Sequence, residues 1–252
     1  MTPKAGAAGP PSAAGAVGNV PTPGHPEPAA VRSMFSGIAH RYDLLNLVLS
    51  LGQDRRWRRR AAQLTRARPG DRVLDACTGT GQLAALLKRR VGDQGQVVGL
   101  DLTEAMLVRA RRRFAGVEFV VGDACHLPFD DDSFEAATMA FGLRNIDRHD
   151  LALAELLRVL RPGGRVVILE FSQVSRALRP WYSAYNRTMI PLVARALLGR
   201  VSAYEYLTES ISAFPPPLVV TRWLREAGFD RARYQRMAFG IVAIHIAVKP
   251  RR

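Results

Sequence analysis

The chain of 252 residues contains only two cysteines, Cys77 and Cys125. Two cysteines cannot build the disulfide framework of a small secreted protein, and their spacing is not that of a zinc site. No apolar run approaches the roughly 18 residues that a membrane-spanning helix requires. The first residues also lack the charged and apolar pattern of a secretion signal. We therefore expect a cytoplasmic protein without a metal site.

Lysine is scarce too: Lys4, Lys88 and Lys249 are the only three, although lysine and arginine together number 36 against 22 acidic residues. A net charge of +14 favours a nucleic-acid or anionic-membrane partner. An excess made almost entirely of arginine also fits the codon usage of a GC-rich genome. Most of it lies in residues 31–116, with 17 basic and 7 acidic residues. The charge alone therefore assigns no partner.

Residues 1–30 contain seven prolines, eight alanines and five glycines. Such a segment cannot bury a core, so we expect a disordered tail followed by one domain over residues 31–252. Within that domain, apolar residues at helical spacing predict a helical segment from Val31 to Gly52. A second helix is expected from Asp54, as N-cap, towards Ala67.

The pattern then alternates between short apolar runs and amphipathic segments. The predicted strands are 72–77, 96–101, 117–121, 134–140, 165–171, 231–235 and 240–248, and the predicted helices are 81–90, 103–114, 149–160 and 218–227. This alternation indicates an α/β fold with a mainly parallel, Rossmann-like sheet of seven strands. Residues 175–214 interrupt it with aromatic and apolar helical sequence, bent at Pro191, which we interpret as a substrate lid.

The sharpest motif is a glycine turn after the first predicted strand. Gly79 and Gly81 lie where the strand passes into a helix, so the backbone can approach a ligand and free N–H groups face it. Asp101 ends the next strand, 20 residues after Gly81, where it can accept from both hydroxyls of a ribose. The glycines alone also fit a nicotinamide-dinucleotide site.

Two further carboxylates favour S-adenosylmethionine over a dinucleotide. Asp75 precedes the glycine turn, where it suits a methionine ammonium group and would repel a pyrophosphate. Asp123 follows the third strand and can accept from the adenine amino group. Aspartate is also common in turns at strand ends, but Asp75, Asp101 and Asp123 together end three consecutive strands around the glycine turn. We therefore predict an S-adenosylmethionine site.

On these and further segments the chain resembles class I S-adenosylmethionine-dependent methyltransferases, and among them the ubiquinone/menaquinone biosynthesis C-methyltransferases, which include demethylmenaquinone methyltransferase. The matching segments are 35–46, 49–52, 75–81, 141–145, 160–164, 203–210 and 240–245. The resemblance implies the seven-stranded class I methyltransferase sheet. It also implies that Thr80, Asp101, Asp123 and Ala124 contact the cofactor, and that Ala140 stands where some members have a contacting serine.

The resemblance further implies methylation of a ring carbon in a polyprenylated quinol, demethylmenaquinol to menaquinol, with benzoquinol methylation in ubiquinone biosynthesis as the alternative. Such chemistry needs a base, or a cation that lowers the phenol pKa. Arg144 and Asn145, after the fourth strand, are expected to hold the quinol oxygen. His245, in the last strand, is expected to be either the base or a buried structural histidine.

Three tyrosines are candidates for the substrate pocket. Tyr42 and Asp43 are expected to close over the cofactor, with packing in an apolar helix stripe as the alternative for Tyr42. Tyr204 and Tyr206 are expected to line the quinol pocket or to belong to the core. The two cysteines have no neighbouring base in the sequence and are expected to be inert.

The basic cluster at residues 55–60 separates the possible partners. In a nucleic-acid methyltransferase, the rival hypothesis, it would bind phosphates. The segment after the fourth strand, however, lacks the Asn/Asp-Pro-Pro-Tyr/Phe signature of amino-directed nucleic-acid methylases. A lipid-tailed substrate would instead suit transient contact with an anionic membrane, on the inner face of which the protein would be peripheral. A solvated helix face is the remaining alternative, and the sequence leaves open whether the protein forms oligomers.

Overall fold

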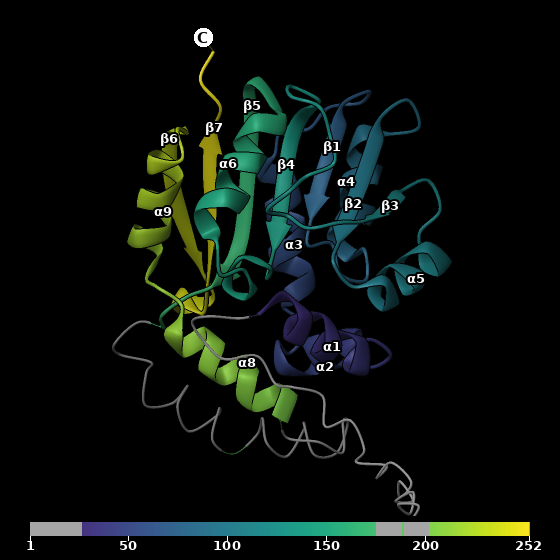
Figure 1. Ribbon diagram of the computed structural model, residues 1–252, viewed down its shortest axis with the longest axis vertical. Helices are drawn as coiled ribbons and strands as arrows, with labels where there is room; N and C mark the ends of the chain where they lie inside the picture. The colour runs from purple at the N-terminus through teal and green to yellow at the C-terminus, as the bar shows by residue number, and fades with distance from the viewer. Residues whose placement is uncertain (1–26, 175–187, 189–201, 252) are drawn as a thin grey trace, which may run out of the picture.

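The computed structural model describes residues 27–174, 188 and 202–251, which form a seven-stranded sheet flanked by helices (Figure 1). The strands are β1 (Arg72–Ala76), β2 (Gln96–Asp101), β3 (Glu118–Val121), β4 (Phe134–Ala140), β5 (Leu160–Phe171), β6 (Asp230–Met237) and β7 (Val242–Val248). Their order is β3-β2-β1-β4-β5-β7-β6. β7 pairs antiparallel with β5 and β6, and the other pairs are parallel. The predicted α/β fold with a mainly parallel sheet is confirmed.

The strand order creates a crevice at the centre of the sheet. The chain runs outward from β1 through β2 to β3 and then returns to β4 on the other side of β1. Open parallel sheets bind ligands at this switch point, beyond the carboxyl ends of the strands. The central strands are buried on both faces, which explains their nearly continuous apolar sequences.

Helices cover the two faces of the sheet in separate groups. On one face lie α3 (Asp54–Leu64), α4 (Gln82–Val91) and α5 (Glu104–Arg113), which share an apolar core with alternate strand residues. On the other face lie α6 (His149–Val159) and α9 (Pro217–Glu226), which pack on the remaining strand residues. Figure 1 shows α6 and α9 in front of the sheet and α3 behind it.

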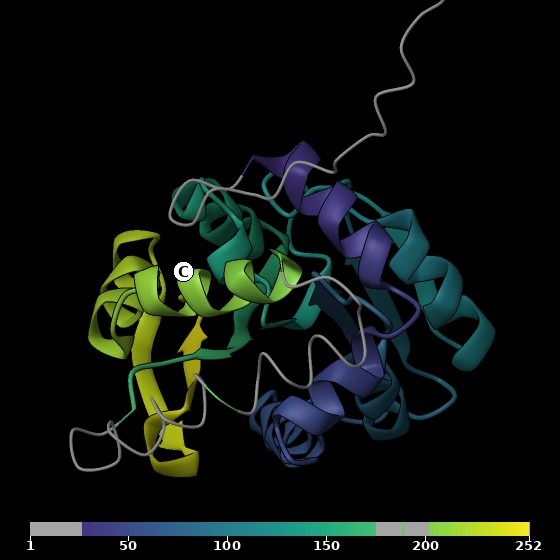
Figure 2. The same cartoon turned by 90° about the horizontal axis from the view of Figure 1, so that it is seen from below.

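Three more helices lie beyond the carboxyl ends of the parallel strands, below the sheet in Figure 1 and facing the viewer in Figure 2. They are α1 (Pro28–Ile38), α2 (Tyr42–Leu49) and α8 (Ser202–Ala213). The predicted helical segment from Val31 is thus two helices, separated by a turn at residues 39–41. α1 begins at Pro28, a residue suited to a first helical turn. The predicted tail boundary at residue 30 was therefore three residues too late.

Other predicted boundaries moved by a few residues. Asp54 is the first residue of α3 and not its N-cap, and α3 ends at Leu64. β5 begins at Leu160, before the Pro-Gly-Gly segment, because Leu160 already pairs with Phe134 of β4. Residues 1–26, and most of the predicted lid with its bend at Pro191, lie outside the described residues. α8 is the described part of that insertion.

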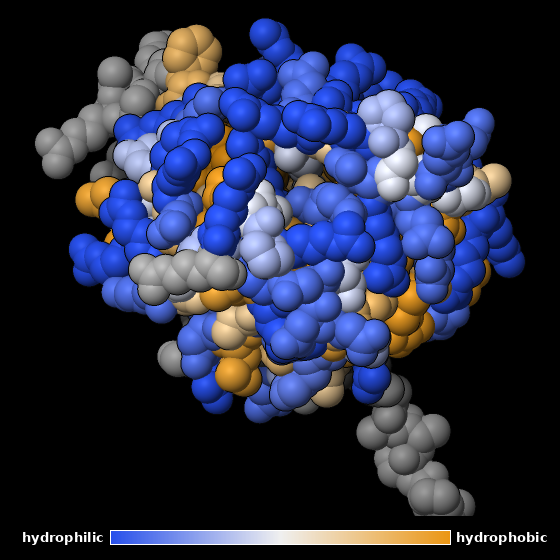
Figure 3. Space-filling view, turned by 90° about the horizontal axis from the view of Figure 1, so that it is seen from above, coloured by the Kyte–Doolittle hydropathy of each residue, from blue (hydrophilic) through white to orange (hydrophobic). Residues whose placement is uncertain are grey.

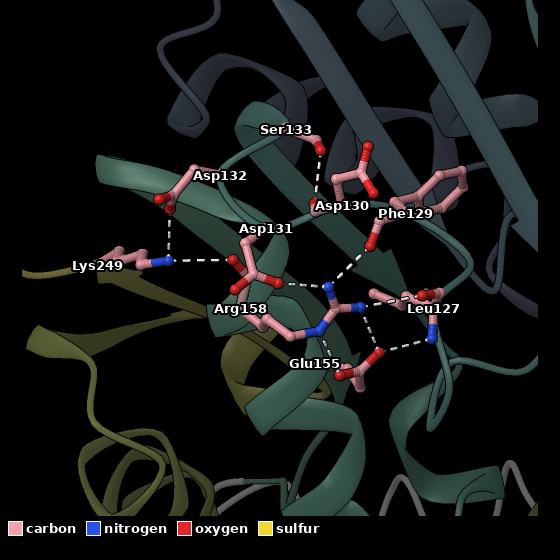
Figure 4. A network of polar contacts seen from close by, with 9 residues as sticks. All are labelled: Leu127, Phe129, Asp130, Asp131, Asp132, Ser133, Glu155, Arg158 and Lys249. Atoms are coloured by element: carbon pink, nitrogen blue, oxygen red, sulfur yellow. Dashed lines mark hydrogen bonds and ion pairs between the residues drawn. The ribbon is translucent and has the colours of Figure 1, made fainter.

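A polar network holds the end of α6 against the loop that precedes β4 (Figure 4). Arg158 donates to Glu155 and Asp131 at 2.7 Å each, and to the backbone oxygens of Phe129 and Leu127 at 2.7 and 3.0 Å. Glu155 in turn accepts from the backbone N–H of Leu127 at 2.7 Å. Arg158 therefore donates to backbone oxygens of the loop that have no partner in the sheet. These bonds hold the loop in place before β4 begins.

The opposite edge of the sheet, where the parallel strands begin, presents mainly hydrophilic side chains (Figure 3). Across the described ranges, no helix is long and apolar enough to cross a membrane. The described cavities lie instead at the carboxyl edge, between the sheet and α1, α2 and α8.

Candidate active site

The glycine turn after β1 has the geometry that its sequence predicted. Gly79 and Gly81 have φ angles of +57° and +79°, a region that side chains other than glycine rarely adopt. A Cβ on Gly81 would lie 2.9 Å from the ring of Phe119, so only glycine fits there. Cys77 and Phe141, which directly follow β1 and β4, also have positive φ angles of 54° and 60°. Strained backbone of this kind gathers at ligand sites.

Asp101 fixes the shape of this turn. Its Oδ2 accepts the backbone N–H of Gly79 at 2.8 Å, and its Oδ1 accepts the N–H of Thr103 at 2.9 Å. Burial raises the pKa of Asp101, and the two N–H donors oppose that shift by stabilising the ionised form. The carboxylate is thus held at the end of β2 beside the glycine turn, as the sequence predicted.

A cavity of about 270 Å³ opens at this point, and we call it the glycine-turn cavity. Four predicted cofactor residues line it together with Gly79: they are Asp101, Asp123, Ala124 and Ala140. The ring of Tyr42, from α2, closes it from the other side. These side chains fit S-adenosylmethionine. The two carboxylates can accept from ribose hydroxyls and from an adenine amine, and the two alanines leave room for the rings. Within the described chain, no cluster of three metal-binding side chains occurs.

Asp75 lies behind this cavity and does not line it. Only 1% of the residue is exposed, and its two oxygens accept hydroxyl hydrogens from Thr78 and Thr138, each at 2.6 Å. Thr138 stands opposite Asp75 in the register of β1 and β4. Burial raises the pKa of Asp75 to about 6, and the two threonine hydroxyls oppose this shift. Both oxygens thus brace the strand ends, and the contact of Asp75 with a methionine ammonium group stays a prediction.

Thr80 and Gly81 also stay outside the residues that line the cavity. The Thr80 hydroxyl donates to Asp43 of α2 at 2.5 Å. Gly81 is the N-cap of α4 and shapes the turn through its backbone. Their contact with the cofactor stays a prediction, and in this structure Thr80 contacts α2 while Gly81 shapes the loop.

A second cavity of about 260 Å³ lies between α1, α2, α3 and α8, and we call it the arginine cavity. Its walls are mostly apolar, and it shares Phe35, Tyr42 and Phe141 with the glycine-turn cavity. The two cavities are therefore neighbours separated by aromatic rings. Such an arrangement suits transfer of a small group between two ligands out of contact with water.

Two buried arginines, Arg58 and Arg144, line the arginine cavity. Arg144 donates to the backbone oxygen of Phe141 at 2.6 Å and to Glu170 at 2.9 Å. Arg58 stacks over the ring of Phe141, and its Nε lies 3.8 Å from the Asp54 carboxylate. The Nε atoms of both arginines are buried and have no hydrogen-bond partner in the structure as described. Both arginines line the cavity, where their positive charge favours an anionic ligand.

Asn145, next to Arg144, faces the other cavity. It lines the glycine-turn cavity, donates to the backbone oxygen of Phe141 at 3.3 Å, and accepts the hydroxyl hydrogen of Tyr206 at 3.0 Å. Tyr206 lines the arginine cavity from α8. Burial raises the pKa of the Tyr206 hydroxyl, which keeps it a donor. Tyr204 belongs to α8 as well, but its side chain is not among those described.

His245 is placed away from both cavities. It pairs with Ile168 in the middle of the sheet, only 1% exposed, and its Nδ1 lies 3.3 Å from the Thr221 hydroxyl. Burial lowers the pKa of His245 to about 4. A base must reach the substrate, so this position favours the structural alternative over the catalytic one.

The sequence had not singled out Arg58, Asp54 or Glu170 as site residues. Helical spacing alone could have separated Arg58 from its exposed neighbours, because the buried residues of α3 recur every three and four positions: they are Asp54, Trp57, Arg58, Ala61 and Ala62. No local signal pairs Glu170 with Arg144, since 26 residues separate them.

Comparison with known proteins indicates a family of methyltransferases. The model of the ubiE/COQ5 methyltransferase family matches residues 25–249. The ubiquinone/menaquinone biosynthesis C-methyltransferase UbiE of Pseudomonas putida is 43% identical over 227 residues, which cover 87% of this chain and 89% of that protein. The demethylmenaquinone methyltransferase of Thermus thermophilus is 45% identical over 222 residues, 86% of this chain and 100% of that protein.

Among solved structures, a methyltransferase of Thermotoga maritima described as a possible histamine N-methyltransferase superimposes with a TM-score of 0.63. It is 20% identical and covers 86% of this chain and 99% of its own. At that identity the likeness concerns the fold alone, which is the class I methyltransferase fold.

Proposed function

Because this chain belongs to the ubiE/COQ5 methyltransferase family, we propose that it methylates a ring carbon of demethylmenaquinol to give menaquinol, using S-adenosylmethionine. The observation that supports this most is the arginine cavity, a mostly apolar space lined by two buried arginines beside the glycine-turn cavity. The relatives from P. putida and T. thermophilus carry names for the same chemistry.

S-adenosylmethionine belongs in the glycine-turn cavity, where it supplies a methyl group on a positively charged sulfur. Asp101 would accept from the ribose hydroxyls and Asp123 from the adenine amine, while Ala124 and Ala140 leave space for the ring system. Asn145 lines the side of this cavity that adjoins the quinol and is held there by Tyr206. Asn145 thus links Phe141, which lines both cavities, to Tyr206 of α8.

The quinol ring belongs in the arginine cavity. A phenol becomes a strong carbon nucleophile when it loses its hydroxyl proton, because the charge spreads into the ring. Arg58 and Arg144 both line this cavity, and their positive charges stabilise that anion, which lowers the phenol pKa. Apolar walls that include Phe141 and Phe171 exclude water and strengthen this effect.

The proton needs an acceptor, and Asp54 is the carboxylate that lines the arginine cavity among the described residues. It is 6% exposed and accepts from the Ser50 hydroxyl at 3.2 Å. Asp54 therefore takes the hydroxyl proton of the quinol, and the Arg58 guanidinium beside it balances the charge. After the ring carbon has gained the methyl group, it loses its own hydrogen as a proton to solvent, and the proton held by Asp54 returns to the oxygen, which restores the aromatic quinol. We expect Asp54→Asn to lower kcat while cofactor affinity stays within twofold of wild type.

We also propose that the protein contacts an anionic membrane, from which a polyprenylated quinol would be drawn. Four arginines of α3 are exposed: they are Arg55, Arg56, Arg59 and Arg60. Two apolar side chains stand exposed nearby, Leu51 at 75% on the rim of the arginine cavity and Phe239 at 79%, two residues before the cavity residue Ile241. Basic residues attract anionic lipid by roughly 1 kcal/mol each. Sedimentation with vesicles containing or lacking anionic lipid tests this contact.

The function is tested by quinone mass spectrometry of a strain that lacks this gene. Demethylated menaquinone is expected to accumulate and to disappear when wild-type protein, but not the Asp101→Ala variant, is restored. Accumulation of a demethylated benzoquinone would favour the ubiquinone alternative, for which the name of the P. putida relative also allows. An unchanged quinone pool would contradict both.

A further inference from the structure

Asp43, in the first turn of α2, makes the closest polar contacts between the helices beyond the sheet edge and the glycine turn. Its Oδ1 accepts the Thr80 hydroxyl hydrogen at 2.5 Å, and its Oδ2 forms an ion pair with Arg113 in the last turn of α5. The Asp43 carboxylate thereby joins α2 to the glycine turn and to α5, both of which contribute residues to the walls of the glycine-turn cavity. The sequence predicts that Asp43 closes over the cofactor with Tyr42, but it does not predict that Thr80 and Arg113 hold Asp43.

The residue before Asp43 explains why this attachment matters. The ring of Tyr42 lies in the walls of both cavities and packs against Gly79, whose Cβ position would be 3.9 Å from the tyrosine Cε1. Tyr42 also meets Phe35 of α1 edge to face, with ring centroids 5.8 Å apart. Fixing Asp43 therefore fixes the aromatic wall that α1 and α2 place over the cofactor.

We propose that Asp43, Thr80 and Arg113 form a clasp that holds α1 and α2 over bound cofactor. The clasp opens when S-adenosylhomocysteine leaves and a new S-adenosylmethionine enters. Asp43 is thus a positioning residue that acts through Tyr42. The assigned role of Thr80 changes with it: its hydroxyl secures the cover and does not bind the cofactor directly.

The two halves of the clasp differ in exposure. Thr80 is buried at 2%, so its hydrogen bond is shielded from salt. The side chains of Arg113 and Asp43 are 44% and 20% exposed, so their attraction weakens as ionic strength rises. Cofactor retention should therefore depend on salt through Arg113 and not through Thr80.

The experiment measures S-adenosylmethionine affinity by calorimetry and S-adenosylhomocysteine release by stopped flow in the full chain. Thr80→Val is expected to weaken S-adenosylmethionine affinity about tenfold, and Arg113→Gln about fivefold. Both losses should come mostly from faster release of the ligand. Thr80→Ser keeps the hydroxyl and should retain wild-type affinity. Arg112→Gln removes the same charge from the preceding, exposed residue of α5 and serves as the matched control.

A double-variant cycle separates the clasp from a direct contact. In an Asp43→Ala background, Thr80→Val should have no further effect, because its partner is already gone. An additive loss would mean that Thr80 touches the cofactor itself and would overturn the proposal, as would affinities within twofold of wild type for both single variants. Turnover gives a second readout: KM for the cofactor should rise while kcat is unchanged or higher. Because binding is measured without any quinol, the result does not depend on the proposed acceptor.

Discussion

Replacing Arg58 with methionine removes a buried cation from the arginine cavity while keeping a side chain of similar length. The Nε of Arg58 has no hydrogen-bond partner among the described residues, and the guanidinium lies over Phe141 in the wall between the cavities. A hydrogen bond from a charged donor contributes roughly 1.5–3 kcal/mol. Asp54 at 3.8 Å partly neutralises this cation, so the lower figure applies. A loss of about 1.5 kcal/mol in the transition state lowers kcat/KM about tenfold.

The assay follows transfer of a labelled methyl group to a short-tailed demethylnaphthoquinol in solution, without vesicles. Arg58→Met should lower kcat/KM about tenfold and move its rise with pH to higher pH, because the phenol pKa is no longer lowered by this cation. Arg58→Lys, which keeps the charge, should recover part of the loss. Arg89→Met changes an exposed arginine of α4 and controls for the general loss of positive charge. Equal activity of Arg58→Met and wild type would refute the role given to the arginine cavity.

Three further predictions concern binding and stability. Asp101→Ala removes the acceptor of the backbone N–H groups of Gly79 and Thr103 and should abolish cofactor binding measurable by calorimetry. Since His245 binds protons more weakly in the folded chain, with a pKa of about 4, its contribution to stability is full above pH 6.5 and is lost as pH falls towards 4. The stability of wild type relative to His245→Asn should therefore fall by about 2–3 kcal/mol between pH 7.5 and 4.5 in urea unfolding; Asp75, which titrates in the same range with the opposite sign, cancels in this comparison. Arg158→Met should lower the free energy of unfolding by about 2 kcal/mol, and a change below 0.5 kcal/mol would mean that the network in Figure 4 is not stabilising.

The backbone of the site could be predicted because it depends on local sequence. Gly79 and Gly81 are required where a strand turns sharply into a helix, and their positive φ angles are observed. Asp101 was predicted from its distance along the chain, since one βαβ step brings the end of β2 beside the turn. These inferences needed only the order and length of elements.

Side-chain direction was the part that sequence could not provide. Asp75 is the last but one residue of β1, yet its carboxylate accepts hydrogen bonds from Thr78 and from Thr138 of β4 behind the turn. His245 sits in the middle of β7, whose antiparallel register with β5 keeps it from the ligand edge. Both outcomes depend on contacts across the sheet, which a reading along the chain does not contain.

Interactions between distant residues set the polarity of the arginine cavity in the same way. Glu170 of β5 neutralises Arg144 across 26 residues and is fully buried. Arg58 was read as part of an exposed basic run, although the period of α3 places it on the buried side beside Trp57. A helical reading of that run would have found Arg58, whereas Glu170 required the fold.

Methyl transfer from labelled S-adenosylmethionine to reduced 2-demethylmenaquinol by the purified chain tests the central claim most directly. The account predicts a monomethylated ring product, identified by mass spectrometry, that forms with the quinol and not with the oxidised quinone. Oxidation removes the hydroxyl proton and the electron-rich ring on which the chemistry depends. Methylation of RNA without turnover of any quinol would contradict the account.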